Sequence, residues 1–323
     1  MLKFIAKRIL TLIPVMLGVS LLVFLILDLA PGDAAQNILG EYADAEALDA
    51  LREEMGLNDP ILVQWARYVW GIVTRGDFGT SYRTGKSVTQ AIFERYPTTV
   101  LMAALGVTFT ALLGITMGII SAVKQYSIWD NLATIVGMIG VSMPTFFIGL
   151  VLVFLLSNQL HLLPASGNKA WYYYIMPVIT ISFTSCSSQM RMTRSSMLEV
   201  LRQDYIRTAR AKGQVERKVI LHHQLRNALI PIITIIGQQV GILLGGTMIV
   251  EQIFAIPGIG KLLIDAIQFR DYPQVRGSVL LLALTFSIVN LVIDLVYAAV
   301  DPRIRSRFTG GKKKAKKGVQ ENA

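Results

Sequence analysis

Only one segment of the sequence has the residue types of a nucleotide-binding loop. Residues 76–87 are rich in glycine and end in Gly-Lys-Ser, the pattern whose backbone N–H groups hold phosphates. Five residues separate Gly79 from Gly85 where that loop needs four, and no apolar strand precedes the segment. No other segment of the sequence fits the pattern. We therefore expect no cofactor in this chain and no ATP hydrolysis by it.

Thiol and imidazole groups are too few and too scattered to predict a metal centre. The single cysteine, Cys186, excludes an internal disulfide and a thiolate cluster. His161 is isolated, and a helix would point the neighbours His222 and His223 about 100° apart. The sequence therefore predicts no metal site, so function must be sought in how the chain is arranged.

The elements that position the remaining functional groups are apolar helices. Hydrophobic residues make up 53% of the chain and charged residues 16%, against the ~25% charged of soluble proteins. Uncharged intervals of about 20 residues cross a ~30 Å hydrocarbon core as helices. Six intervals lack Lys, Arg, Asp and Glu: 9–27, 96–123, 131–168, 170–190, 227–250 and 277–293. The sequence therefore predicts an all-α, polytopic membrane bundle of six transmembrane helices.

Two of these intervals allow more than one interpretation. The interval 131–168 is too long for one helix, and its end at 158–168, with a proline and a glycine, is typical of a connecting loop. The interval 9–27 follows basic residues, as the core of a secretory signal does. It is longer than the usual ~7–15 residue signal core, and more apolar intervals follow it. An uncleaved membrane anchor is the simpler interpretation.

Basic residues indicate on which side of the membrane each loop lies. Nine Lys or Arg lie in 191–226 and eight in 303–317, whereas the two short loops of the opposite side hold four. Basic loops stay in the cytoplasm, so we expect both termini there. The net charge of +10 is then an orientation signal, and a nucleic-acid partner is not expected. We expect the lysine-rich tail to contact membrane lipid.

The same pattern divides the chain into parts. We expect a cytoplasmic N-terminus and first transmembrane helix at 1–29, an extracytoplasmic segment at 30–97, a core with five helices at 98–301 and a basic cytoplasmic tail at 302–323. Within the core, 191–227 forms a long cytoplasmic loop. This loop carries the most informative motif of the sequence.

A short surface helix is predicted inside the cytoplasmic loop. Leu198, Leu201, Tyr205 and Ala209 keep a helical repeat, and Gly213 is a natural helix stop. Small side chains at 209 and 211 permit close approach by another protein, and the arginines offer partners for its acidic groups. A basic helix that lies on the membrane surface fits the same pattern. The residues alone leave both interpretations open.

Arg207-Thr208-Ala209-x-x-x-Gly213 resembles the Glu-Ala-Ala-x-x-x-Gly loop of permease subunits of bacterial ATP-binding-cassette (ABC) importers. Arginine and threonine replace the acid and the first alanine of that loop, and Arg226 stands where many members have proline. Further motifs resemble the dipeptide, oligopeptide and nickel branch of this family. They lie at 30–33, 76–79, 141–144, 204–213, 225–231, 245–251, 254–260, 270–273 and 301–304. The long segment 30–97 is similar to that of the first of the two permease subunits in this branch.

The resemblance implies a function and a set of partners. The core 98–301 would have the type I ABC importer transmembrane fold, in the bacterial plasma (inner) membrane. The partners would be a second permease subunit, two ATPase subunits that bind ATP and Mg²⁺, and an extracytoplasmic solute-binding protein. The chain itself would be a permease without catalytic residues. The helix ending at Gly213 would be the coupling helix that docks on an ATPase, with contacts from Tyr205, Arg207, Thr208, Ala209, Arg210 and Gly213.

Polar residues inside apolar intervals, and acids at the ends of such intervals, are candidates for the translocation path or its gate. They are Gln238, Gln239, Glu251 and Asp294. For Asp294, near the inner end of the last helix, a structural bond to a backbone donor or to Arg303 competes with a substrate contact. Glycines at 237, 241 and 245 recur every four residues and permit close helix packing. Gly237, Gly241 and Gly245 pack within this subunit, against the partner permease or along the substrate path.

The substrate and the class of transporter each have alternatives. Peptides are the leading substrate class implied by the resemblance, and nickel or a chelated metal is the second. A self-contained secondary transporter or channel is the competing class of protein. It would predict charged residues at mid-membrane or paired broken helices. Apart from Asp294 and a proline at 144, the sequence shows neither.

Overall fold

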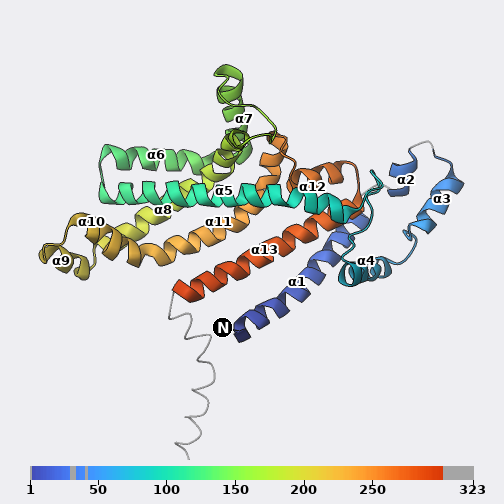
Figure 1. Ribbon diagram of the computed structural model, residues 1–323, viewed down its shortest axis with the longest axis horizontal. Coiled ribbons are helices and arrows are strands. Elements are labelled where there is room, and N and C mark those ends of the chain that lie inside the picture. The colour runs from blue at the N-terminus through green and yellow to red at the C-terminus, as the bar shows by residue number, and fades with distance from the viewer. Residues whose placement is uncertain (1, 30–33, 41–42, 301–323) are drawn as a thin grey trace, which may run out of the picture.

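The computed structural model describes residues 2–29, 34–40 and 43–300, and these form helices without a strand (Figure 1). The long helices are α1 (Leu2–Leu29), α5 (Val88–Val123), α6 (Ile128–Ser142), α8 (Ile175–Leu201), α11 (Arg226–Ile253) and α13 (Tyr272–Val300). The short ones are α2 (Ala34–Leu39), α3 (Ala45–Glu54), α4 (Ile61–Arg75), α7 (Thr145–Leu152), α9 (Asp204–Ala211), α10 (Glu216–Lys218) and α12 (Ile259–Gln268). The tail 302–323 and the motifs at 30–33 and 301–304 lie outside the described residues.

The long helices run along one axis of the molecule. Figure 1 shows α9 and α10 at one end of this bundle, and α2, α3, α4 and α12 at the other. Charge explains this separation, because the α9 end carries the cluster of basic residues that cannot enter a hydrocarbon core. The two ends are therefore the two candidate aqueous faces of the molecule.

The helices confirm an all-α membrane bundle. By length and composition, four can cross a membrane: Arg8–Leu29, Val88–Val123, Glu216–Gly245 and Tyr272–Val296. A fifth crossing is the bent pair Ile128–Ser142 and Thr145–Gln159. The sixth expected helix, α8, has 27 residues, long enough to cross, but its serines and arginines make it too polar to be recognised by hydropathy.

The third expected span is broken in its middle. The chain bends by 109° between α6 and α7, where the sequence predicted one helix followed by a loop. Pro144 lacks an N–H and forces the preceding Met143 into an extended conformation, with ψ at 130°. α7 consequently lies across the bundle (Figure 1). Irregular structure from residue 160 onwards confirms most of the predicted loop at 158–168.

α5 begins earlier than its apolar interval suggests. The hydroxyl of Ser87 accepts a hydrogen bond from the backbone N–H of Gln90 at 3.4 Å, so the helix starts at Val88. It then continues through Pro97 to Val123. The expected boundary between 30–97 and 98–301 therefore falls inside one helix, because charged residues of the first turns project beyond the apolar interval.

The centre of the bundle is the contact between α5 and α8. Small residues repeat along α5 at Gly106, Gly114 and Gly118, and all three are buried. A Cβ added at Gly114 would lie 2.8 Å from Gln189, and one at Gly118 would lie 2.5 Å from Thr193. Because these three positions of α5 carry no side chain, polar groups of α8 lie directly against the backbone of α5.

The glycines of α11 pack less uniformly. A Cβ at Gly241 would collide with the ring of Phe286 of α13, and Gly237 is buried. At Gly245 nothing lies within 4 Å of such a Cβ, and the residue is exposed. Gly241 therefore packs within this subunit, whereas Gly245 faces an opening between α11 and α13.

The segment after α1 folds back onto it. Trp65 of α4 donates its indole N–H to the hydroxyl of Ser20 at 2.9 Å. The rings of Phe24 and Tyr68 lie 5.3 Å apart, which adds an aromatic contact between the two helices. α4 thus packs against one end of α1, and α2 and α3 lie at the same end of the bundle (Figure 1).

We predict that adding one methyl group to α5 separates it from α8. Gly118→Ala should lower the free energy of unfolding by about 1–3 kcal/mol, because the new Cβ meets the backbone oxygen of Met190 at 2.7 Å. The measurement is thermal unfolding in detergent, followed by intrinsic fluorescence. Gly18→Ala is the control, since nothing lies within 4 Å of its Cβ. Equal midpoints for both variants would contradict this packing.

Candidate functional site

The second half of the predicted surface helix is present as α9, whereas Leu198 and Leu201 belong to α8, because the helix is interrupted at 202–203. Its end is fixed by the N–H of Lys212, which donates to the carbonyl oxygen of Thr208 at 3.0 Å. Gly213 follows with φ at 72°, the left-handed conformation in which glycine avoids the Cβ clash. This turn sends the chain back towards α10 and α11.

α9 has one buried and one open face. Ile206 is fully buried and Ala209 is 7% exposed, and both pack against Val219. The open face consists of Tyr205, Arg207, Thr208 and Arg210. The structure differs from expectation at Ala209, which lies one turn from Ile206 and so shares its inward face. The small side chain lets α9 approach its own chain.

Polar bonds hold α9 against the segment that follows it. The guanidinium of Arg210 donates to both carboxylate oxygens of Glu216, at 2.6 and 3.1 Å. The hydrogen bond with Glu216 raises the pKa of Arg210, so this side chain stays charged. Gln214 and His223 add a side-chain hydrogen bond of 2.7 Å. The segment 204–223 therefore behaves as one unit that presents a basic surface.

An ion pair with a buried carboxylate joins α6 and α8 close to this unit. Asp130, 3% exposed, accepts hydrogen bonds from the Nε and Nη2 of Arg194 at 2.7 and 2.9 Å. The carboxylate also accepts from the hydroxyl of Ser121 and the N–H of Tyr126. Asp130 stands at the start of α6, and Arg194 stands near the end of α8, shortly before α9. The pair thus joins the α5–α6 turn to the helix that leads into the surface unit.

Polar side chains of α7, α8 and α11 enclose a small cavity of about 150 Å³. We call it the polar cavity; its polar lining is Thr145, Thr184, Ser185, Ser188 and Gln239. The hydroxyl of Ser185 donates to the Oε1 of Gln239 at 2.7 Å, and the hydroxyl of Thr184 has no partner in the described chain. Gln238 is exposed and does not line this cavity. Of the two glutamines, the structure brings Gln239 to a polar interior.

Glu251 is fully buried at the junction of α5, α11 and α12. Its carboxylate accepts from the hydroxyl of Thr99 at 2.7 Å and from the N–H of Lys261 at 2.9 Å. Thr99 in turn accepts from the N–H of Ile259 at 2.8 Å. An anion here satisfies the free N–H groups at the start of α12 and favours its helix dipole. Glu251 therefore fastens α12 across the end of the bundle.

Asp294 lies on the surface between α1 and α13. It forms an ion pair with the Nη2 of Arg8 at 2.8 Å. The side chains are 26% and 47% exposed, which is typical of a pair at a membrane–water boundary. Arg303, the partner considered from the sequence, lies outside the described residues. The observed pair joins the first and last helices.

Two family models match this chain. Residues 114–306 match the binding-protein-dependent transport system inner membrane component, and this match covers more than half of the chain. Residues 1–103 match the N-terminal part of such membrane components. The chain belongs to this family.

Relatives and a solved structure agree with this assignment. The glutathione transport system permease protein GsiC of Salmonella paratyphi A is 42% identical over 305 residues, which cover 94% of this chain and 99% of GsiC. GsiC of Escherichia coli K12 is 40% identical over the same shares. A solved amino acid ABC transporter has a TM-score of 0.50 and 15% identity, and covers 67% of this chain and 94% of its own. That likeness concerns the fold alone.

The family fixes the function at a coarse level. The chain is the permease subunit of an ABC importer, a multi-pass protein of the inner membrane and not an enzyme. This confirms the resemblance to the dipeptide, oligopeptide and nickel branch. An ABC importer permease works with a partner permease, ATPases and a solute-binding protein, so the secondary transporter and channel alternative is set aside.

Sequence reasoning missed the ion pair and the polar cavity. Asp130 directly precedes the charge-free interval 131–168, and Arg194 was counted only as a cytoplasmic basic residue. A carboxylate at the border of an apolar interval is a signal that a buried partner exists. The serines of α8 gave a weaker signal, because isolated hydroxyls also bond to their own helix backbone.

We predict that breaking the ion pair weakens the fold. Asp130→Ala leaves Arg194 without its carboxylate and should lower the free energy of unfolding by about 1–3 kcal/mol. The matched control is Asp49→Ala, which removes a carboxylate from a pair on an exposed surface. Thermal unfolding of both variants in detergent gives the comparison. A loss at Asp130 no larger than that at Asp49 would show that the pair does not stabilise the bundle.

Proposed function

We propose that this permease forms, with a second permease subunit, a translocation path for short peptides. The relatives' name supports the substrate class, since glutathione is itself a small peptide and the similarity extends over 94% of this chain. The polar cavity supports the path. Its hydroxyl and amide groups offer both donors and acceptors, which peptide groups require when they leave water.

The proposed orientation places both termini and α9 in the cytoplasm. The basic residues of 191–226 support it, because they gather at the α9 end of the bundle. The segment of α2, α3 and α4 then lies outside, where a solute-binding protein delivers its ligand. ATP and Mg²⁺ bind to the ATPase subunits in this arrangement, and this chain holds neither.

The open face of α9 is the proposed contact with an ATPase subunit. Tyr205 supplies an apolar surface that is 44% exposed, and Arg207 supplies positive charge, whereas the charge of Arg210 is balanced by Glu216. When two ATPase subunits close on ATP, a contact that differs between the open and closed states shifts the bundle between its conformations. The Asp130–Arg194 pair supports transmission, since it connects the base of α8 with the α5–α6 turn. Gln239 and Gly245 lie on α11, which we expect to move when the bundle changes conformation.

We predict that Gly213→Val uncouples ATP hydrolysis from uptake. Valine is strained at φ of 72°, at a cost of about 1–2 kcal/mol, so the turn after α9 should open and shift the docking face. Uptake by cells and co-purification of the ATPase should both fall, while the amount of permease in the membrane is unchanged.

Asn is the matched control at this position. Asparagine tolerates the left-handed conformation, so Gly213→Asn should keep most of the uptake. No atom lies within 4 Å of a Cβ at Gly213, so a steric clash inside this chain does not explain a difference between the variants. Full uptake by Gly213→Val would overturn the assignment of α9 as the coupling helix.

The substrate is tested in the reconstituted importer. The permease is purified with its partner permease, ATPases and solute-binding protein, and ATP hydrolysis is measured in liposomes. We expect trialanine or glutathione, presented by the solute-binding protein, to stimulate hydrolysis several-fold over the unliganded protein. Stimulation by Ni²⁺ with none by either peptide would assign the importer to the nickel class. Stimulation by no peptide would contradict the proposed substrate class.

A further inference from the structure

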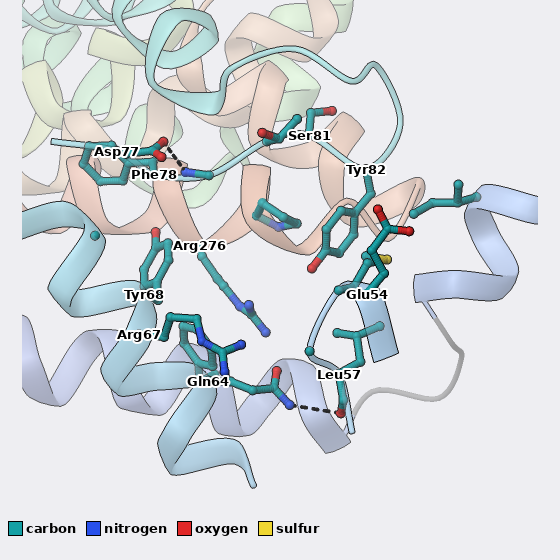
Figure 2. Close-up of a pocket in the computed structure, with 18 of the residues that line it drawn as sticks. Glu54, Leu57, Gln64, Arg67, Tyr68, Asp77, Phe78, Ser81, Tyr82 and Arg276 are labelled. Atoms are coloured by element: carbon teal, nitrogen blue, oxygen red, sulfur yellow. Dashed lines mark hydrogen bonds between the residues drawn. The ribbon is translucent and has the colours of Figure 1, made fainter. Parts of the chain in front are cut away.

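A larger cavity lies at the opposite end of the bundle from α9. Its volume is about 570 Å³, within the ~300–1,000 Å³ range of small-molecule sites. We call it the α4 cavity. It is enclosed by α3, α4, the loop 76–82 and the ends of α1 and α13. Figure 2 shows side chains from these elements pointing into it.

Arg276 of α13 is the central charge of the α4 cavity. Its guanidinium stacks over the ring of Phe24, with the carbon 3.5 Å from the ring centre. Its Nε is buried and has no hydrogen-bond partner, and among the described residues Arg276 forms no ion pair. In Figure 2 the guanidinium extends into the cavity between Tyr68 and Tyr82. Asp28 acts on this guanidinium electrostatically, but no carboxylate of the described residues lies at ion-pair distance, as one normally does beside a buried cation.

Phenol groups beside Arg276 suit the same anion. The hydroxyl of Tyr68 is buried and has no partner in the described part of the chain. Burial raises the pKa of Tyr68 and that of Tyr82, so both hydroxyls stay protonated. Protonated phenols donate hydrogen bonds, and a carboxylate accepts them from Tyr and Arg together. The Nε of Arg276 and the hydroxyl of Tyr68, two donors without an acceptor among the described residues, therefore lie on one side of the cavity.

Acidic groups line two separate parts of the cavity, Asp77 on the side of Tyr68 and Glu54 beside Tyr82 (Figure 2). Glu54 and Asp77 both line the α4 cavity, and neither forms an ion pair among the described residues. Asp77 accepts the N–H of Gly79 at 2.8 Å with one oxygen, which leaves the other oxygen available. Carboxylates are the natural partners of an ammonium group. Glu54 thus offers a cation site in the same cavity, on the other side of Arg276 from Tyr68 (Figure 2).

Two other arginines of this end of the molecule show what is unusual about Arg276. Arg67 also lines the cavity, but it already pairs with Asp59. Arg83 stacks on the ring of Phe269 at 3.4 Å, as Arg276 does on Phe24, but Arg83 is exposed and water solvates its charge. Arg276 alone among these three is enclosed without a carboxylate.

We propose that the α4 cavity binds a small zwitterionic solute, with its carboxylate on Arg276 and Tyr68 and its ammonium group towards Glu54. Short peptides with free ends belong to this class, so the inference rests on the proposed function and adds a second place where the permease holds substrate. The solute meets the cavity before it reaches the polar cavity between α7, α8 and α11. The sequence did not single out Tyr68 or Arg276, although the motifs 76–79 and 270–273 also contribute to the lining.

The test is a direct binding measurement that involves no transport. The permease, together with its partner permease and ATPases, is placed in lipid nanodiscs without ATP and without solute-binding protein. Trialanine is titrated by calorimetry, beside trialaninamide, which lacks the carboxylate, and N-acetyl-trialanine, which lacks the ammonium group. We expect trialanine to bind, and each capped peptide to bind roughly ten-fold or more weakly.

Variants locate the site. Arg276→Gln should weaken trialanine binding roughly ten-fold or more, and Tyr68→Phe should weaken it several-fold while leaving the packing against Phe24 intact. Arg83→Gln removes the matched arginine outside the cavity and should bind as the unaltered protein does. Unfolding midpoints of all variants are measured in parallel. If Arg276→Gln does not fold, Tyr68→Phe alone decides.

Several outcomes would overturn the inference. Equal affinity for trialanine and its two capped forms would show that the charged ends are not recognised. Unchanged affinity in both Tyr68→Phe and Arg276→Gln would show that the peptide binds elsewhere. If no variant affects peptide binding but Arg276→Gln prevents association of the solute-binding protein, the cavity receives an acidic side chain of that protein instead. If trialanine stimulates ATP hydrolysis by the complete importer but does not bind the permease complex in nanodiscs, the α4 cavity is not a peptide site and the proposed function is unaffected.

Discussion

The arrangement of the bundle depends on enclosing α8, a helix that is too polar to face lipid. Hydroxyls and amides repeat along it, and unpaired polar groups in hydrocarbon cost several kcal/mol each. Glycines of α5 and α6 allow α8 to be enclosed, because at these positions no side chain keeps the helices apart and lipid is excluded. Gly106, for example, offers its carbonyl oxygen to the hydroxyl of Ser182 at 3.1 Å. The polar groups that suit a translocation path are therefore kept inside the protein by packing.

The same helix connects the two regions to which we assign function. One stretch of α8 contributes Ser185 to the polar cavity, and its far end carries Arg194 and leads into α9. α8 ends at Leu201 and α9 begins at Asp204, so only Arg202 and Gln203 separate the two helices. Asp130 joins the α5–α6 turn to this end of α8. At the opposite end, Glu251 binds α12 to α11 and α5, which gives the bundle a closed cover there.

Much of the fold follows from patterns that are local in sequence. The apolar intervals predict the long helices because each helix satisfies its own backbone, and Gly213 predicts the end of the surface helix through its left-handed φ. The bend at Pro144 was not predicted, since a proline within an apolar run is also tolerated inside a straight helix. Ala209 was assigned to an outer surface because a small residue suits any close contact, and only its neighbours Ile206 and Val219 reveal which one.

The sequence by itself determined the class of the protein, the expected sidedness of its loops and the position of the surface helix, because these depend on composition and on residues within a few turns of each other. Tertiary structure decided which polar residues meet. Asp130 and Arg194, Thr99 and Glu251, and Arg8 and Asp294 are far apart along the chain, and no local pattern records such pairs. Arg276 is the clearest case, since its lack of a carboxylate becomes visible only when Phe24, Tyr68 and Tyr82 surround it.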